Sequence, residues 1–331
     1  MRRRSWVAPI LLLLGSTAVT LALLELGLTV AGFSTAPMDI QVIRQSDARY
    51  LHVFEDDNFE HHPDLIWTPK RFHSVFNGQA FRGPELHGPK RSGALRLFAV
   101  GDSNTLGWSG PNGTHWPGDL ARLIERIHPD STLVNAGVWG YASYQGVRRV
   151  RQVLEFEPDI VFVSFGANDA HFVMESDKEY EARAFRNTDL GRAMQQWRLG
   201  ELVLSVIDRA TRPNMTTGPR VSLEDYRANL RTMVEEGRAH GADVVLLTRP
   251  YMGPIDNPLW WKNRAADYAA ATIDVAAELE APLVDVYSYF KGRDELFADE
   301  SHFNDEGHRL AAEVIFDHIQ PLIASRRIDL Q

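Results

Sequence analysis

The chain has 331 residues, 44% of them hydrophobic and 24% charged, so it can bury a real core and has room for a catalytic domain plus an appendage. Its 44 acidic residues outnumber its 35 basic ones, and the net charge of −9 has the wrong sign for a protein that binds nucleic acid phosphates. The absence of cysteine excludes disulfides, thiolate metal sites and a cysteine nucleophile.

The N-terminus predicts a membrane helix. Arg2 to Arg4 precede an uncharged stretch from Val7 to Leu24, and apolar residues continue after Glu25 as far as Phe33. This run is long enough to span a bilayer, whereas the apolar core of a cleavable signal peptide has about 7 to 15 residues. We therefore expect residues 1–33 to be an uncleaved signal anchor. The arginines predict a cytoplasmic N-terminus and an extracytoplasmic catalytic domain, periplasmic or extracellular.

Two short motifs keep cleavage open as an alternative. Thr29-Val30-Ala31 and Ser34-Thr35-Ala36 both have small residues at the spacing of a cleavage site, although Pro37 weakens the second. Either way, a chain without cysteine cannot carry the lipid of a bacterial lipoprotein.

Residues 34–93 form the next segment, which shows little periodicity. Prolines interrupt it, so we expect an irregular lead-in that packs on the catalytic domain rather than a core of its own. These prolines are Pro37, Pro63, Pro69, Pro84 and Pro89.

From residue 94 to 331 the pattern is that of one α/β catalytic domain. Short, largely non-alternating apolar runs are typical of buried parallel strands, and stretches with helical periodicity separate them. Strands that alternate with helices predict a five-stranded parallel sheet covered on both faces. The segment 171–221 is too long for a simple connection and is interpreted as an insertion with a helix around Leu202 to Ile207. The expected strands are Leu95–Val100, Thr132–Val134, Ile160–Phe165, Val244–Leu247 and Leu283–Val286.

Polar residues follow these runs, at the edge where parallel sheets bind ligands. A serine needs a base to take its proton, and the base needs a third group to fix its tautomer. We predict that Ser103 is the nucleophile, His302 the base and Asp299 the acid that orients it. The backbone N–H groups of Ser103 and Gly137 and the side-chain amide of Asn168 are expected to form the oxyanion hole.

These residues give the sequence a resemblance to the SGNH hydrolases, also called GDSL-type esterases and lipases. Ser103 in Gly-Asp-Ser, Gly137, Asn168 in Gly-Ala-Asn-Asp, and Asp299 with His302 match the four motif blocks of that family in order. The resemblance covers about residues 94–325, and the stretch 77–84 is similar to the lead-in of membrane-anchored bacterial members. It implies a flavodoxin-like α/β/α fold and ester hydrolysis through an acyl-serine, with no metal and no cofactor. The sequence departs from the family pattern at position 104, which is Asn where Leu is expected.

Other polar residues receive less prominent roles. Asp102 and Asp169 are expected to hold turns near the nucleophile, and Asp285 is a rival for the triad acid. His308 is expected on a helix face. His61 and His62 are interpreted as solvated loop residues, because no second cluster has metal-ligand spacing.

The residues around the motif loops bear on the substrate. Aromatic residues near the motif loops suit a sugar-binding or acyl-binding mouth: Trp108, Trp116, Trp139, Tyr141 and Tyr144. With the outward placement, this favours an esterase that removes acyl groups, acetyl above all, from an extracytoplasmic carbohydrate. The alternatives are an O-acetyltransferase with the same triad, a lipid-directed esterase, and an inactive glycan-binding envelope protein. No nucleic acid partner is expected, and the sequence predicts no particular protein partner.

Overall fold

The computed structural model describes residues 7–33, 58–62, 65–107, 113–173, 176–178, 189–211, 218–252 and 262–329. Its centre is a five-stranded parallel sheet in the order β4-β3-β5-β8-β9, which confirms the predicted fold class and gives the flavodoxin-like strand order. The strands are β3 (Leu95–Gly101), β4 (Ser131–Asn135), β5 (Ile160–Ser164), β8 (Asp243–Leu247) and β9 (Leu283–Val284).

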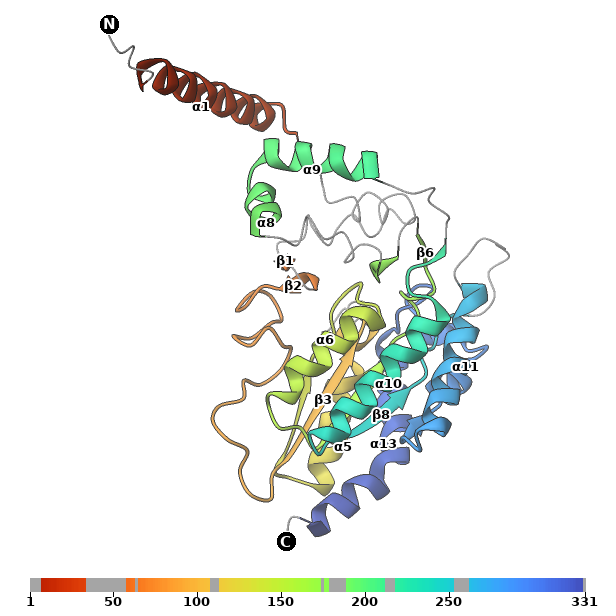
Figure 1. Cartoon of the computed structure of the whole chain (residues 1–331). Helices are drawn as coiled ribbons and strands as arrows, with labels where there is room; N and C mark the ends of the chain where they lie inside the picture. Colours follow the sequence, from red (N-terminus) through yellow and green to blue (C-terminus); the bar gives the residue numbers. More distant parts are fainter. Residues whose placement is uncertain are drawn as a thin grey trace, which may run out of the picture.

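Helices cover both faces of the sheet, so the domain has three layers (Figure 1). Alternate residues along each strand point into two separate cores because successive side chains in a strand face opposite ways. On one face, Phe98 and Val163 pack beneath α6 (Ser143–Leu154), α10 (Leu223–Ala239) and α11 (Lys262–Glu278). On the other, Leu97 and Phe162 pack beneath α5 (Trp116–Ile127) and α13 (Asp305–Asp329).

The element boundaries differ from the sequence expectations mainly at the ends of strands. The third run stops at Ser164, and the fifth stops at Val284 because Asp285 caps a short helix, α12 (Val286–Phe290). A side-chain cap begins α10, where the Ser222 hydroxyl accepts a hydrogen bond from the Asp225 N–H.

The lead-in is more ordered than its composition suggests. Within its described part, β1 (Phe59–His62) and β2 (Ile66–Pro69) form an antiparallel hairpin. Trp67 of this hairpin is buried, packs edge-on against Tyr141 and donates its indole N–H to the carbonyl of Trp139 at 3.0 Å. The Tyr141 hydroxyl donates in return to the Trp67 carbonyl at 2.7 Å. The hairpin therefore supports the loop that follows β4.

Two further regions lie outside the three layers. The apolar helix α1 (Val7–Val30) contains a stretch, Pro9–Val30, that is long and apolar enough to cross a membrane. The predicted insertion holds two helices, α8 (Asp189–Gln195) and α9 (Arg198–Thr211), and the small antiparallel pair β6 (Phe172–Val173) and β7 (Gly218–Pro219). Figure 1 shows α1 beside α9, away from the central sheet.

Arg149 of α6 connects three segments in the core. Its guanidinium is buried, lies over the Phe81 ring at 4.5 Å, and donates to the carbonyls of Ala136 at 3.0 Å and Ala80 at 2.7 Å. Burial lowers the pKa of Arg149 to about 10, which still leaves it charged at neutral pH. One cation thus joins the lead-in, the loop after β4 and α6.

Replacing this arginine tests the connection. Arg149→Met keeps the apolar part of the side chain but leaves two buried carbonyls without their donor, so we expect the free energy of unfolding to fall by about 3 kcal/mol. Arg148→Met is the matched control. Arg148 is only half-buried, over the Tyr144 ring, and its replacement should cost about 1 kcal/mol or less. Urea denaturation of both variants gives the comparison, and equal losses would contradict the assigned role.

Candidate active site

Ser103 stands where β3, the second strand in the sheet, gives way to a short helix. It is the first residue of α4 (Ser103–Leu106), two residues after the strand ends at Gly101, and it is 5% exposed. Asp102 caps the helix by accepting a hydrogen bond from the Asn104 N–H at 2.9 Å. The turn projects Ser103 from the carboxyl edge of the sheet.

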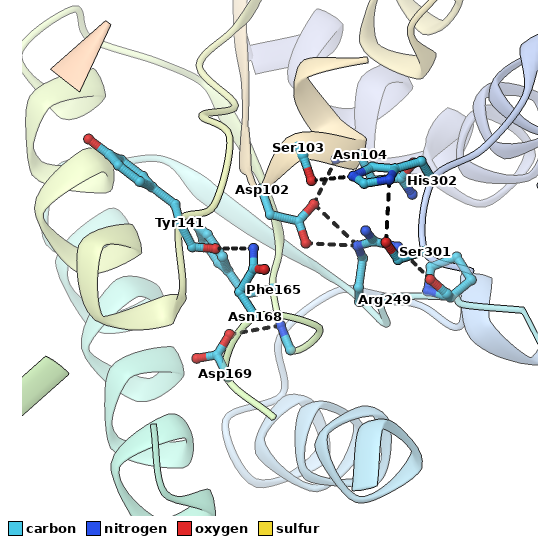
Figure 2. A network of polar contacts seen from close by, with 12 residues as sticks. Asp102, Ser103, Asn104, Tyr141, Phe165, Asn168, Asp169, Arg249, Ser301 and His302 are labelled. Atoms are coloured by element: carbon cyan, nitrogen blue, oxygen red, sulfur yellow. Dashed lines mark hydrogen bonds and ion pairs between the residues drawn. The ribbon is translucent and has the colours of Figure 1, made fainter. Parts of the chain in front are cut away.

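The structure brings Ser103, His302 and Asp299 into one hydrogen-bonded line. Ser103 Oγ lies 2.7 Å from His302 Nε2, although 199 positions separate the two residues in sequence. On the other side of the ring, His302 Nδ1 lies 2.8 and 2.9 Å from the two carboxylate oxygens of Asp299. Figure 2 shows the Ser103–His302 contact next to the contacts between Asp102 and Arg249. A carboxylate on Nδ1 keeps the proton there and leaves Nε2 free to take a proton from serine.

Asp299 is held as an anion. Burial acts to raise its pKa, but the hydrogen bond and charge of His302 and the backbone N–H groups of Ser301 and His302 outweigh burial and lower the pKa well below its ordinary value. Because Asp299 accepts from the backbone of the residue it orients, acid and base belong to one rigid turn.

Asp285, the rival acid, has other partners. Its carboxylate accepts from the Thr248 hydroxyl at 2.7 Å and from the Ser288 hydroxyl at 2.5 Å at the start of α12, and it makes no hydrogen bond to His302. Its place is structural.

A buried ion pair beneath the nucleophile was missed by the sequence reading. Arg249 Nε lies 2.9 Å from Asp102 Oδ2, and both side chains are almost fully buried. Arg249 follows β8 by two residues, so a full search of the residues after each strand would have found it. The pair ties Asp102, which precedes Ser103, to the segment after β8. In the sheet, β8 lies two strands away from β3.

Asn104, where the sequence departs from the family pattern, also has a structural partner. Its side-chain oxygen accepts from the Phe303 N–H at 3.0 Å, and Asn104 is 3% exposed. This hydrogen bond ties the helix that carries Ser103 to the residue after His302. The departure therefore adds a hydrogen bond between the segments that carry Ser103 and His302.

Asn168 lies in a loop that is pinned on both sides. Its Nδ2 donates to the Tyr141 carbonyl at 2.9 Å, which uses one of its two amide protons (Figure 2). The neighbouring Asp169 carboxylate accepts from the backbone N–H groups of Ser143 at 2.9 Å and Gly166 at 3.0 Å. Complete burial raises the pKa of Asp169 to about 6 despite these hydrogen bonds. Asp169 therefore holds the Asn168 loop, as its expected turn-holding role requires.

The expected role of Gly137 conflicts with its geometry. Its N–H donates to the Asn135 side chain at 2.9 Å, and a Cβ at this position would lie 2.5 Å from the Leu106 nitrogen. Gly137 is thus a close-packing position between its own loop and helix α4, with its N–H already used.

Gly140, three residues further on, has the features that Gly137 lacks. It adopts a positive φ of 73°, which favours glycine, and its N–H has no acceptor among the residues that the structure describes. It also precedes Tyr141, whose carbonyl holds Asn168. The sequence signal was present, because Gly140 stands in the same motif.

His308 faces the core rather than solvent. It is fully buried on α13, and its Nδ1 accepts from the Trp116 N–H at 3.2 Å. Burial and nearby cationic groups lower the pKa of His308 to about 3, so the ring is neutral at physiological pH. His62 lies in β1 and accepts from the Leu65 N–H, whereas the side chain of His61 is outside the described part.

The aromatic residues expected at the mouth are mostly part of the core. Trp116, Trp139 and Tyr141 are buried, and Trp108 lies outside the described residues. Tyr144 is half-buried, with the Arg148 guanidinium 4.6 Å from its ring centre. Of the five, Tyr144 is the aromatic that the described structure leaves partly open to solvent.

Comparisons with known proteins match the chain to a family. The family model of the GDSL-like Lipase/Acylhydrolase family matches residues 99–310. The chain is 24% identical over 259 residues to an uncharacterized lipoprotein, YqeF, of Bacillus subtilis, covering 68% of this chain and 87% of that protein. It is 32% identical over 75 residues to an arylesterase of Vibrio mimicus, covering 22% and 38%.

Solved structures align with the chain at low identity. A lipase/acylhydrolase from Enterococcus faecalis aligns with a TM-score of 0.48 and 22% identity over 69% of this chain and 96% of that one. An acetylxylan esterase from Geobacillus stearothermophilus aligns with a TM-score of 0.48 and 20% identity over 70% and 96%.

The role of Asp299 can be tested with an amide. Asp299→Asn places a group on His302 Nδ1 that can donate, which favours the tautomer with its proton on Nε2, so we expect kcat for an activated ester to fall by roughly 10³- to 10⁴-fold. Asp285→Asn is the control, and its kcat should change little because Asp285 does not contact His302. Steady-state kinetics on p-nitrophenyl acetate measures both, and a larger loss in the Asp285 variant would reverse the assignment.

The Asn168 amide can be tested by truncation. Asn168→Ala removes the side-chain amide that is expected to donate to the developing oxyanion, so kcat should decrease by roughly 10²-fold or more with KM largely preserved. Thermal unfolding of the variant checks that the loop is intact. An unchanged kcat in a folded variant removes Asn168 from the site.

Proposed function

Because the chain belongs to the GDSL-like lipase/acylhydrolase family, we propose that it hydrolyses esters through an acyl intermediate on Ser103, with His302 as base and Asp299 as the orienting acid. The observation that carries this proposal is the hydrogen-bonded line from Ser103 Oγ to Asp299, with contacts of 2.7 and 2.8 Å. A serine hydroxyl gains nucleophilicity when a neutral imidazole accepts its proton.

The reaction proceeds in two halves. His302 Nε2 takes the Ser103 proton as Oγ attacks the ester carbonyl, and the resulting imidazolium is stabilised by Asp299. The tetrahedral intermediate collapses when His302 gives that proton to the leaving alkoxide, which departs as an alcohol. Water then attacks the acyl-serine with His302 again as base, releasing the carboxylic acid and restoring Ser103.

The negative oxygen of the tetrahedral intermediate needs donors that are already in place. We assign the Ser103 N–H and the side-chain amide of Asn168 as two of them. For the third we assign Gly140 in place of Gly137, because the Gly140 N–H is unengaged among the described residues and that of Gly137 is bonded to Asn135. Fixed donors of this kind lower the barrier without having to reorganise during the reaction.

We place the catalytic domain outside the cytoplasm on an uncleaved α1. The arginine triplet at positions 2–4 supports this orientation. Retention of α1 is supported by its contact with the folded chain, since the Glu25 carboxylate accepts from the backbone N–H groups of Arg198 and Leu199 at 2.9 Å each. A relative that is named a lipoprotein fits a membrane-bound position as well.

The substrate that we propose is an O-acylated carbohydrate of the cell envelope, with acetyl as the acyl group. Tyr144 supports a sugar ligand, since it is partly exposed and lies three residues after Tyr141, whose carbonyl holds Asn168. The α1–α9 contact favours a second candidate, a lipid ester, because it keeps the domain beside a bilayer. Transfer of the acyl group to a sugar hydroxyl would use the same acyl-serine.

A fluorophosphonate probe tests the nucleophile directly. The full-length protein in detergent should be labelled at Ser103, and Ser103→Ala should lose the label, because only an activated serine reacts readily. Mass spectrometry of the digest locates the adduct. A folded protein that takes no label would favour the glycan-binding alternative.

Substrate assays then separate the remaining classes. Acetate release from acetylated polysaccharide supports the proposed esterase, whereas acetyl transfer to a sugar acceptor identifies a transferase. Preferential hydrolysis of long-chain esters in mixed micelles would assign the site to lipid.

A further inference from the structure

The membrane-spanning stretch of α1 contains one acidic residue with a defined partner. Glu25 lies within Pro9–Val30, and both of its carboxylate oxygens accept from the first turn of α9, at the N–H groups of Arg198 and Leu199. The Arg198 guanidinium in turn donates to the carbonyl of Phe33, just beyond the end of α1. An ionisable residue inside a span is costly unless it is paired, so this contact indicates that α9 docks at the depth of the bilayer.

The helices of the insertion carry apolar side chains that the protein does not cover. Leu199, Val203 and Val206 follow the i, i+4, i+7 spacing of one helix face on α9. Val203 is 41% exposed, Val206 58% and Trp197 60%. An amphipathic helix with a partly exposed tryptophan at its start is typical of the membrane interface.

A groove separates α1 from the α8–α9 pair, and we refer to it as the anchor groove. Its volume is about 590 Å³, in the range of small-molecule sites. Its walls are almost entirely apolar, and the Glu25 carboxylate lies at one end. The lining residues are Ala18, Leu21, Ala22 and Glu25 of α1, and Ala193, Met194, Trp197, Leu199, Gly200 and Val203 of the insertion.

We propose that the anchor groove binds the acyl chain of a bilayer lipid, and that α8 and α9 lie in the outer leaflet against α1. This inference rests on the proposed membrane placement of α1. The groove is continuous with the surface of the span, no residue of which is fully buried by the protein, so that surface must face hydrocarbon if α1 crosses a membrane. Lipid reaches such a groove without leaving the bilayer.

The elements between the anchor groove and the sheet show which end of the domain the groove is near. β6 follows the β5 loop that carries Asn168, and the β1–β2 hairpin supports the loop after β4, so both mark the carboxyl edge of the sheet. Figure 1 shows both on the side of the domain that faces α8 and α9. The lipid-binding element and Ser103 therefore belong to the same end of the molecule.

Photocrosslinking in a membrane tests the inference. The full-length protein is reconstituted in phosphatidylcholine vesicles that contain a phospholipid with a diazirine on its acyl chain, irradiated, digested and mapped by mass spectrometry. We expect lipid adducts on Met194, Trp197 and Val203 as well as on α1. Glu25→Ala should lose most of the α8–α9 adducts and keep those on α1, because it removes the carboxylate that holds α9.

Controls separate the possible failures. Leu26→Ala, at an exposed neighbouring position of α1, should keep the full adduct pattern, and all variants should hydrolyse p-nitrophenyl acetate like the wild type. Adducts on α1 alone would overturn the lipid groove while leaving the membrane anchor in place. Adducts on neither helix would overturn both the anchor and the groove, without bearing on ester hydrolysis. Replacing Trp197 with a photoreactive amino acid in the same vesicles would assign the groove to a second copy of the chain if that residue crosslinks to protein rather than to lipid.

Discussion

The parallel register of the central sheet is the constraint on which the active site depends. Parallel strands all end at the same edge, so the loops after β3, β4 and β5 meet although they are far apart in sequence. The return of the chain through α12 then brings the turn with Asp299 and His302 to that edge. Antiparallel neighbours would have sent alternate loops to opposite ends.

Buried polar contacts below the surface keep these loops in register with one another. The Asp102–Arg249 pair holds the base of the nucleophile turn, and Asp169 holds the Asn168 loop through two backbone N–H groups. Desolvating such charges is expensive, and the geometry offsets the cost only when the hydrogen bonds are nearly complete. We interpret their presence around Ser103 as a contribution to precision rather than to net stability.

The sequence was sufficient for the architecture because apolar runs and helical periods report burial directly. The strand positions were predicted to within a few residues, and the order of the four motifs located the site. It was less informative where function depends on the direction of a single N–H. Gly137 and Gly140 are both glycines of one motif, and only the three-dimensional turn shows that Asn135 occupies the first of them. The burial of Trp116, Trp139 and Tyr141 was not predicted for a related reason. The sequence near a loop does not say whether an aromatic ring faces solvent or the core.

The contact between Glu25 and α9 changes how the enzyme samples its substrate. A domain on a flexible tether explores a hemisphere above the membrane, whereas one whose insertion helix is fastened to its own anchor keeps one orientation toward the lipid. Its encounters with ester are then set by the number of ester groups per unit area of surface, not by their concentration in the surrounding fluid. On the membrane anchor that we propose, catalysis by this chain would be a two-dimensional process, in which lateral diffusion along the membrane replaces diffusion through solution.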